Sequence, residues 1–453
     1  MAKRIDNVQL KIEDYKFPNK GTAKYNGLKA EIPFALPGQT VRCNLLKKKG
    51  RYITNSFTVE EKADYEIPSD CPAFGSCGGC TFRTMPYEKQ LELKKNTVLK
   101  LMSDAGIEGF DFKGIKASPS ANEYRNKMEF SFGDTGLQGE LALGMRKRGS
   151  FYEVADASEC KLVHPDITKI LRETLDFFKG TDERFYHKMK KEGVLRHLLV
   201  RRAAFMGEIL VALITTSQIK TDLAPWCEKI LALPLEGSVA GVLHIINDGV
   251  ADVVKADKIN NLFGRDYIYE KLLGLTFKIS VFSFFQTNSA GAEVLYQTVA
   301  DFAKELNPKY VFDLYCGTGT IAQLMSRTAE RVIGIEIVEE AVAAAKTNAA
   351  LNNITNCTFI ADDVLKGADA LTGSPDLIIL DPPREGLHPK ALEKICRNFN
   401  SPHLIYVSCK PTSLTRDLLL LKNHNYVPKI MTCVDMFPHT PHVETVVLLT
   451  KNE

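Results

Sequence analysis

The stretch "VFDLYCGTGTIA", residues 311–322, decides the fold of this chain. An apolar run ends in a glycine-rich turn, and a helical pattern follows the turn. Gly317 and Gly319 let the backbone turn tightly and approach a ligand without a clash from a Cβ atom. The next apolar run, "RVIGIEIV", delivers Glu336, whose carboxylate can accept hydrogen bonds from both hydroxyls of a ribose. The stretch therefore predicts a nucleotide-like cofactor bound by a βαβ unit.

The same alternation extends over residues 281–453, where short apolar runs alternate with helical stretches such as "EEAVAAAKTNAALNN". Short apolar strands joined by helical crossovers are typical of a doubly wound, largely parallel sheet. We therefore expect an α/β, Rossmann-like domain here. The apolar runs are "YVFDLYCG", "RVIGIEIV", "TFIADDV", "DLIILDPP", "HLIYVSC" and "VETVVLLT".

The identity of the cofactor is ambiguous from the glycine loop alone. With Ala322 the loop also fits the relaxed dinucleotide pattern G-x-G-x-x-A, so an NAD-dependent oxidoreductase is one alternative. Asp313 and Tyr315 precede the loop, and a pyrophosphate gains nothing from a nearby acid. An acid can instead hold a cationic methionyl group, which favours S-adenosylmethionine.

The remaining chain predicts two further domains. Residues 1–60 contain short β segments with turn signals and predict a small β-barrel. Residues 1–58 hold 12 Lys and Arg against 4 Asp and Glu, although the whole chain carries only +3. This local excess of positive charge favours a polyanionic partner such as RNA. Residues 61–280 predict a mixed α+β domain with an antiparallel sheet.

A helix is predicted over residues 86–105, with an apolar stripe of Leu91, Val98, Leu99 and Met102. Pro86 suits its first turn. This helix belongs to the middle segment by sequence and is a candidate to pack against the catalytic domain.

The chain has no apolar leader segment and no apolar run long enough to span a membrane, so a cytoplasmic protein without a membrane partner is expected. Its eleven cysteines are odd in number and mostly scattered. A disulfide framework is therefore disfavoured, and metal binding or catalysis is favoured.

The segment "DLIILDPPREG" places Asp381 on a rigid, proline-rich loop at the ligand-binding edge of the predicted sheet. Methyltransferases that act on exocyclic amines carry an aromatic residue where this chain has Arg384. That difference favours methylation of a ring carbon. C5 of uracil becomes nucleophilic only after a thiolate adds to C6, and a base must later remove the C5 proton.

Two residues meet these demands. Cys409 ends the run "HLIYVSC", beside the predicted Asp381 loop, and Glu444 opens the last apolar run. Cys409 is therefore the candidate nucleophile, although a cysteine alone is more often a core residue. Glu444 is the candidate general base. His439 and His442 are alternative bases, each of which more often has a structural role.

Taken together, these motifs resemble the RNA uracil-C5 methyltransferases of the TrmA/RumA type, over nearly the whole chain. The resemblance rests on "CPAFGSCGGC", "FSFFQTN", "DLYCGTGT", "DPPREG", "SCKPTSLTRD" and "DMFPHTPHVE". It implies a TRAM-like N-terminal β-barrel, a nucleophilic Cys409 and a proton-abstracting Glu444. It also implies cofactor contacts from Gln286, Tyr315, Glu336, Asp363 and Asp381. Lys410 departs from the family pattern, which more often has Asn or Asp there.

Cys71, Cys77 and Cys80 form a C-x5-C-G-G-C cluster, and Cys160 is the best fourth ligand. Four thiolates suit either a zinc ion or an iron–sulfur cluster, and the spacing does not choose between them. The resemblance implies a [4Fe–4S] cluster with a structural or RNA-positioning role. A radical methyltransferase is disfavoured, because the C-x3-C-x2-C triad is absent.

The expected activity is methylation of uridine C5 in RNA, with 23S rRNA as the leading substrate and tRNA as the alternative. The target base should be flipped out of its stack to reach Cys409. A non-catalytic RNA-binding protein with a vestigial methyltransferase domain is the alternative from a different class. A monomer is expected.

Overall fold

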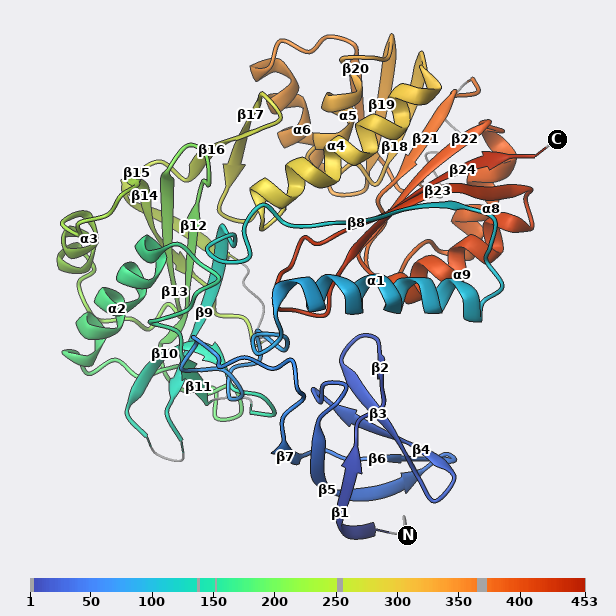
Figure 1. Cartoon of the computed structure of the whole chain (residues 1–453). Helices are drawn as coiled ribbons and strands as arrows, with labels where there is room; N and C mark the ends of the chain where they lie inside the picture. Colours follow the sequence, from blue (N-terminus) through green and yellow to red (C-terminus); the bar gives the residue numbers. More distant parts are fainter. Residues whose placement is uncertain (1–3, 137–138, 151–152, 251–255, 365–372, 453) are drawn as a thin grey trace.

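The structure is a computed structural model that describes residues 4–136, 139–150, 153–250, 256–364 and 373–452. Figure 1 shows an N-terminal sheet in blue, a central sheet in green and a C-terminal α/β unit in yellow to red. No helix of the described residues is long and apolar enough to cross a membrane.

The N-terminal sheet has seven strands in the order β1-β5-β6-β4-β3-β2, with β7 paired to β5. Alternate residues such as Val8, Ile32 and Val41 are buried in a small apolar core of its own. The short strands that the sequence predicts are therefore present, while their assignment to the TRAM type stays a prediction. The strands are β1 (Arg4–Lys11), β2 (Asp14–Lys16), β3 (Lys20–Tyr25), β4 (Leu28–Pro33), β5 (Thr40–Lys48), β6 (Arg51–Ile53) and β7 (Phe57–Glu61).

The central sheet has the order β11-β10-β9-β12-β13-β14-β15 and is antiparallel except between β13 and β14. Helices α2 (Pro165–Lys179) and α3 (Ala224–Leu231) share an apolar core with it, as the amphipathic pattern of α2 requires. The strands are β9 (Lys127–Asp134), β10 (Leu141–Arg146), β11 (Val154–Asp156), β12 (Leu195–Arg202), β13 (Glu208–Thr215), β14 (Ser238–Ile246) and β15 (Lys258–Gly264). A hairpin of β16 (Tyr267–Leu272) and β17 (Leu275–Ser280) follows.

The C-terminal sheet has the order β20-β19-β18-β21-β22-β24-β23-β8. The strands from β20 to β22 run parallel, and β24 runs antiparallel to both of its neighbours. The predicted α/β class is therefore confirmed. The strands are β8 (Asp111–Lys116), β18 (Tyr310–Leu314), β19 (Arg331–Glu336), β20 (Cys357–Ala361), β21 (Leu377–Leu380), β22 (His403–Ser408), β23 (Tyr426–Val434) and β24 (Glu444–Lys451).

Helices cover both faces of this sheet. One core joins Val311 of β18 to α4 (Ser289–Leu306), α5 (Thr320–Met325) and α6 (Glu339–Leu351). The other core joins Phe312, the next residue of the same strand, to the helices of the opposite face. Successive strand residues point to opposite faces, so the continuous apolar runs follow from a sheet buried on both sides. The helices of the second face are α1 (Tyr87–Asp104), α8 (Pro389–Asn398) and α9 (Pro411–Lys422).

Helix α1 and strand β8 lie against this C-terminal unit although they precede the central sheet in sequence. β8 extends the C-terminal sheet by pairing with β23, and α1 lies along α9 (Figure 1). The buried residues of α1 recur every four positions, as expected for one helix face. They are Gln90, Lys94, Val98 and Met102. The predicted apolar stripe is therefore half right, because Leu91 and Leu99 are only partly buried and two polar residues complete the buried face.

Candidate functional site

A cavity of about 1780 Å³ lies at the carboxyl edge of the C-terminal sheet. The parallel strands all end at this edge, which brings Tyr315, Glu336, Asp381 and Cys409 together. The antiparallel β24 begins there with Glu444. The volume exceeds the roughly 300–1,000 Å³ of a typical ligand pocket, so a cofactor and a nucleotide can fit together.

The cavity collects most of the residues that the sequence singled out. Gly319 and Asp363 are the two predicted site residues that do not line it. Those that do are Cys71, Cys77, Cys80, Cys160, Gln286, Asp313, Tyr315, Gly317, Glu336, Asp381, Cys409 and Glu444.

The glycine loop has the backbone geometry that the sequence predicts. Gly317 and Gly319 have φ of 54° and 75°, in the left-handed region that favours glycine. A Cβ atom on Gly319 would lie 2.6 Å from the ring of Phe359, so this glycine acts through close packing. The amide of Gly317 donates to Glu336 Oε2 at 3.1 Å, which ties the loop to the end of β19.

Two carboxylates lie at the centre of the edge: Asp313 is buried and Asp381 is partly buried. Burial and the charge of Asp381 raise the pKa of Asp313 to about 8, and burial raises the pKa of Asp381 to about 7. Asp313 Oδ2 accepts a hydrogen bond from the amide of Ala322 at 2.8 Å, whereas Oδ1 has no partner among the described residues. Such a carboxylate is satisfied best by a cationic donor.

Tyr296 is a site residue that sequence reasoning missed. It lies on α4 and lines the cavity, and a side-chain hydrogen bond joins its phenol to Gln286. Burial and the charges of Asp381, Glu444 and Asp313 raise the pKa of Tyr296. The phenol therefore stays neutral and can orient Gln286 beside the acids. Its position in an amphipathic helix gives no signal of this role.

Cys409 and Glu444 are brought together by strand register. In the antiparallel pair of β22 and β24, Ser408 lies opposite Thr445. Extending the same register by one residue places Cys409 beside Glu444, although the two lie 35 positions apart in the sequence. The nucleophile and the base predicted from the sequence therefore face the same cavity.

The charges around these two residues favour their protonated forms. Burial, followed by the charges of Glu444 and Asp381, raises the pKa of Cys409 to about 11. Burial and Asp381 raise the pKa of Glu444 to about 8. Arg384 acts in the opposite direction on both groups, because its positive charge favours the thiolate and the carboxylate.

The loop that carries Arg384 is fixed by α9. Ser413 Oγ donates to the Arg384 carbonyl oxygen at 2.9 Å, and the Leu387 amide donates to Asp417 Oδ2 at 2.7 Å. Arg416 donates to the Leu387 carbonyl oxygen at 3.1 Å. The motifs "DPPREG" and "SCKPTSLTRD" thus form one hydrogen-bonded unit around Cys409.

Lys410, which departs from the family pattern, points to the same loop. Its Nζ atom lies 3.4 Å from both carboxylate oxygens of Glu385 in an exposed ion pair. The pair links the residue after Cys409 to the residue after Arg384.

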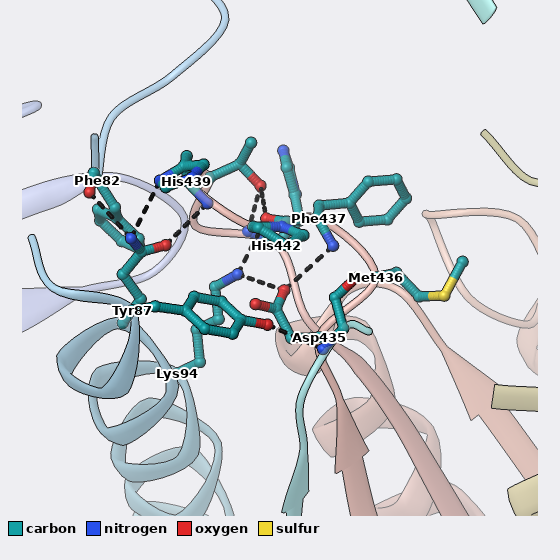
Figure 2. Close-up of polar contacts among 12 residues, drawn as sticks. Phe82, Tyr87, Lys94, Asp435, Met436, Phe437, His439 and His442 are labelled. Atoms are coloured by element: carbon teal, nitrogen blue, oxygen red, sulfur yellow. Dashed lines mark hydrogen bonds and ion pairs between the residues drawn. The ribbon is translucent and has the colours of Figure 1, made fainter. Parts of the chain in front are cut away.

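The two histidines of "DMFPHTPHVE" are poor candidates for the general base, because the pKa of each ring is lowered. Burial and the charge of Arg83 lower the pKa of His439 to about 4, and burial and Arg384 lower the pKa of His442 to about 4. His439 does not line the cavity; instead its backbone and ring meet Gln90 of α1 (Figure 2). His442 lines the cavity beside Glu444.

Asp363 lies near Tyr315 but outside the cavity lining, and its charge contributes to the raised pKa of Tyr315. Its predicted contact with the adenine therefore stays a prediction.

The four clustered cysteines come from two segments and gather at one end of the cavity. Each thiol lies close enough to the others to act electrostatically: burial and Cys160 raise the pKa of Cys80 to about 12, and Cys71 contributes to the raised pKa of Cys77 and Cys160. Across the described residues, however, no three His, Cys, Asp or Glu side chains converge in a metal-binding arrangement.

Arg148 fixes the cysteine loop. Its guanidinium donates to the carbonyl oxygens of Cys77 (3.0 Å) and Cys80 (2.5 Å), and it lies 4.4 Å from the ring centroid of Phe34, which directly follows β4 of the N-terminal sheet. The loop thus connects the N-terminal sheet to the cavity.

The three-layer fold, the glycine loop and the acids at the sheet edge define a class I S-adenosylmethionine-dependent methyltransferase. The model of the tRNA (uracil-5-)-methyltransferase family matches residues 86–452. The chain belongs to this family of RNA uracil-C5 methyltransferases. The matched range begins at the start of α1, so this helix is part of the family unit.

Similar proteins include RNA methyltransferases, and a solved structure shares the fold. An uncharacterized RNA methyltransferase of Clostridium tetani is 49% identical, with 98% of each chain covered. One from Clostridium acetobutylicum is 48% identical, covering 100% of this chain and 99% of that one. The tRNA (uracil-54, C5)-methyltransferase of Pyrococcus abyssi, solved with S-adenosyl-L-homocysteine, shares the fold with a TM-score of 0.77 at 24% identity. That alignment covers 98% of this chain and 100% of the other.

Proposed function

We propose that this protein methylates C5 of a uridine in 23S rRNA, with Cys409 as nucleophile and Glu444 as general base. The observation that carries the proposal is the register of β22 and β24, which sets a thiol beside a buried carboxylate in a cavity large enough for a nucleotide. A vestigial, non-catalytic domain would have no use for buried acids with raised pKa values.

In the proposed reaction the Cys409 thiolate adds to C6 of the flipped uracil, and the ring electrons move to C5. C5 attacks the methyl carbon that S-adenosylmethionine would supply when bound, the sulfur–methyl bond breaks, and S-adenosylhomocysteine is the leaving group. Glu444 then takes the proton from C5, the electrons of that C–H bond restore the C5–C6 double bond, and the C6–S bond breaks to release the thiolate. Arg384 lies where it favours the anionic forms of both residues.

The residues of the edge suit the methyl donor. The free Oδ1 of Asp313 fits a cationic ammonium group, and Glu336 after the glycine loop fits ribose hydroxyls. Gln286, Tyr315, Gly317, Gly319, Asp363 and Asp381 complete the proposed cofactor set. An NAD-dependent oxidoreductase would leave the pairing of Cys409 and Glu444 without a purpose.

The variant Glu444→Gln tests whether Glu444 is the general base. Glu444→Gln removes the proton acceptor but keeps the side-chain volume, so the covalent RNA–protein species should accumulate. Gel electrophoresis under denaturing conditions measures that species. Turnover at the wild-type rate would exclude Glu444 as the base.

Transfer RNA is the second candidate substrate. It is favoured by the name of the matching family and by the likeness to the tRNA (uracil-54, C5)-methyltransferase of Pyrococcus abyssi. Methylation of 23S rRNA transcripts and of tRNA transcripts by the purified protein separates the two. Incorporation of one methyl group at one mapped uridine of 23S rRNA, with none in tRNA, supports the first proposal, and the reverse pattern supports the second.

For the cysteine cluster the proposed occupant is a [4Fe–4S] cluster held by Cys71, Cys77, Cys80 and Cys160. The proximity of four thiols suits an iron–sulfur cluster and zinc alike, and the resemblance to the RumA type favours the cluster. Among the described residues no three of these thiols form a metal-binding arrangement, so the metal analysis decides the proposal. Anaerobic purification should give iron and sulfide in a ratio of about one to one, and Cys77→Ser should abolish both. One equivalent of zinc without iron would overturn the proposal.

The proposed division of the chain is a TRAM-like RNA-binding barrel (1–60), a central α+β domain (61–280) and a methyltransferase domain (281–453). Helix α1 and strand β8 lie within the range of the central domain but pack with the methyltransferase domain. The protein is proposed to act as a cytoplasmic monomer with RNA as partner.

Three cations surround Glu31 in the first domain: Lys16, Lys20 and Arg51. Burial alone would raise the pKa of Glu31, but hydrogen bonds from Lys16 and Lys20 lower it to about 2.

A further inference from the structure

The segment between β23 and β24, residues 435–443, forms a wall of the reaction cavity and leads directly into Glu444. Phe437, Thr440 and His442 of this segment line the same cavity as Cys409. Val434 and Glu444 lie opposite each other in the strand pair, so the segment is a closed loop with fixed ends. Any shift of this 435–443 loop therefore moves the wall beside the base.

Helix α1 holds the first half of the loop through a buried ion pair. Lys94 Nζ lies 2.6 Å from Asp435 Oδ1, and their side chains are 1% and 0% exposed. Lys94 also donates to the Phe437 carbonyl oxygen at 3.0 Å, and the Phe437 amide donates to the same Asp435 oxygen at 3.1 Å. Figure 2 shows Lys94 reaching from α1 to Asp435 and the loop beyond it.

The second half of the loop is held by Gln90, one turn earlier on the same helix. The His439 amide donates to Gln90 Oε1 at 2.8 Å, and Gln90 Nε2 donates to the Met85 carbonyl oxygen at 2.8 Å. The His439 carbonyl oxygen accepts from the amides of Thr81 and Phe82. His439 has φ of 64°, a conformation that a residue with a Cβ keeps only when its surroundings enforce it.

The contacts of Lys94 with the 435–443 loop do more than stabilise the fold. Replacing a buried ion pair by well-packed apolar residues is often neutral for stability. An apolar pair cannot reproduce the two contacts of the Lys94 ammonium group at the start of the loop, one with the Asp435 carboxylate and one with the Phe437 carbonyl oxygen. The loop geometry, and not only the packing, depends on the ammonium group.

We propose that Lys94 is a positioning residue that sets the 435–443 loop, and through it Glu444, for removal of the C5 proton. This inference rests on the proposed role of Glu444 as base. Lys94 does not line the cavity, so it acts only through the loop. The step that it supports is the last one, in which the base takes the proton and the C6–S bond breaks.

The test compares Lys94→Met, the double variant Lys94→Met/Asp435→Leu and a matched control, Lys89→Met, on the exposed side of the same helix. Purified proteins react with uridine-containing RNA and S-adenosylmethionine. The readouts are the covalent RNA–protein fraction, the rate at which it decays to methylated RNA, binding of S-adenosylhomocysteine, and the thermal midpoint.

The proposal predicts that the double variant folds with a thermal midpoint near that of the wild type and binds S-adenosylhomocysteine normally. Decay of its covalent species should nevertheless slow by about tenfold to a hundredfold, because small misplacements of a reacting group have effects of this size. Lys94→Met should show the same slowing if it folds, and Lys89→Met should match the wild type.

Decay at the wild-type rate in the double variant would overturn the positioning role, since it would show that only charge balance mattered. Equal slowing in Lys89→Met would overturn it as well. Glu444→Gln separates this inference from the proposed function. If Glu444→Gln fails to accumulate the covalent species, the base assignment fails; if it accumulates the species and the double variant does not, only the inference about Lys94 fails.

Discussion

At the scale of single residues, burial and charged neighbours set the pKa of Cys409, the proposed nucleophile. Burial and the charges of Glu444 and Asp381 raise the pKa of Cys409 to about 11, and Arg384 together with a backbone hydrogen bond to the thiol opposes them. The free enzyme therefore keeps this cysteine as a thiol near neutral pH. Binding of a cationic methyl donor beside Asp381 would offset part of the negative charge, so we expect the thiolate to form mainly when the cofactor is present.

Neighbouring substitutions should shift this pKa in opposite directions. Glu444→Gln removes a negative charge and should lower the pKa of Cys409, whereas Arg384→Gln removes a positive charge and should raise it. The measurement is the rate of alkylation by iodoacetamide against pH, followed by mass spectrometry of the peptide that contains Cys409. The two variants serve as controls for each other, and a shift in the same direction for both would contradict the account.

The pH dependence of catalysis follows from the same residues. Glu444 must be ionised to accept a proton, and its pKa is raised to about 8, so its active form becomes more populated as pH rises. The thiolate of Cys409 likewise becomes more populated. We predict that kcat/KM, which reports the free enzyme, rises steadily between about pH 6 and pH 9. A profile that is flat or falls over this range, with the protein still folded, would be inconsistent with these roles.

At the scale of elements, the site depends on loops that are held by helices from other parts of the chain. Gly386 has φ of 76° and sits against α9: a Cβ atom there would lie 2.4 Å from Asp417 Oδ2. Because Asp417 also holds Leu387 and the phenol of Tyr406, this glycine sets how closely the Arg384 loop approaches α9.

Gly386→Ala should therefore displace the Arg384 loop and reduce kcat as well as the thermal midpoint. Gly27→Ala is the matched control, because Gly27 has φ of 74° with nothing within 4 Å of its Cβ position. The free energy of unfolding of the control should fall by only about 1–2 kcal/mol, the cost of a left-handed backbone for a residue with a Cβ atom, and its activity should be unchanged. Equal losses of stability and equal activity in both variants would show that the contact with α9 is unimportant.

The sequence predicts the elements well where the pattern is local. Strands β18, β19, β21 and β22 appear as continuous apolar runs because both of their faces are buried, and the glycines mark the loop between β18 and α5. Lys94 shows the limit of such reasoning: a lysine in a helical pattern is expected to be exposed, and its partner Asp435 lies 341 residues away. Tyr296 could not be predicted either, because its position fits the apolar pattern of an ordinary amphipathic helix.

At the scale of the whole molecule, the cavity lies between the C-terminal sheet and the cysteine loop, and Arg148 connects that loop to the N-terminal sheet. RNA that enters the cavity can therefore meet all three parts of the chain. The sequence indicates each part separately. It does not indicate that β8 completes the C-terminal sheet, because a strand on a distant edge leaves no local signal of its partner.

The basic N-terminal sheet should contribute a salt-dependent share of RNA affinity. Lys47, Lys48 and Lys49 form the exposed tip between β5 and β6. Changing all three to alanine should weaken RNA binding at low salt and reduce the slope of log affinity against log salt by up to about 2, since each lost contact with single-stranded RNA removes about 0.7.

The control for this prediction is Lys304→Ala/Lys309→Ala/Lys422→Ala, which removes the same charge from exposed positions that do not line the cavity. Fluorescence anisotropy at several salt concentrations measures both triple variants. An unchanged slope in the first triple variant, or the same change in both, would mean that this sheet does not bind RNA.

The most direct test of the account is trapping with RNA that carries 5-fluorouridine at the target site. Fluorine at C5 leaves no proton for Glu444 to remove, so methyl transfer should end in a stable covalent species. We predict a denaturation-resistant RNA–protein adduct that requires S-adenosylmethionine, maps to Cys409 and is absent in Cys409→Ser. An adduct at another cysteine, or one that persists in Cys409→Ser, would contradict the assignment of the nucleophile.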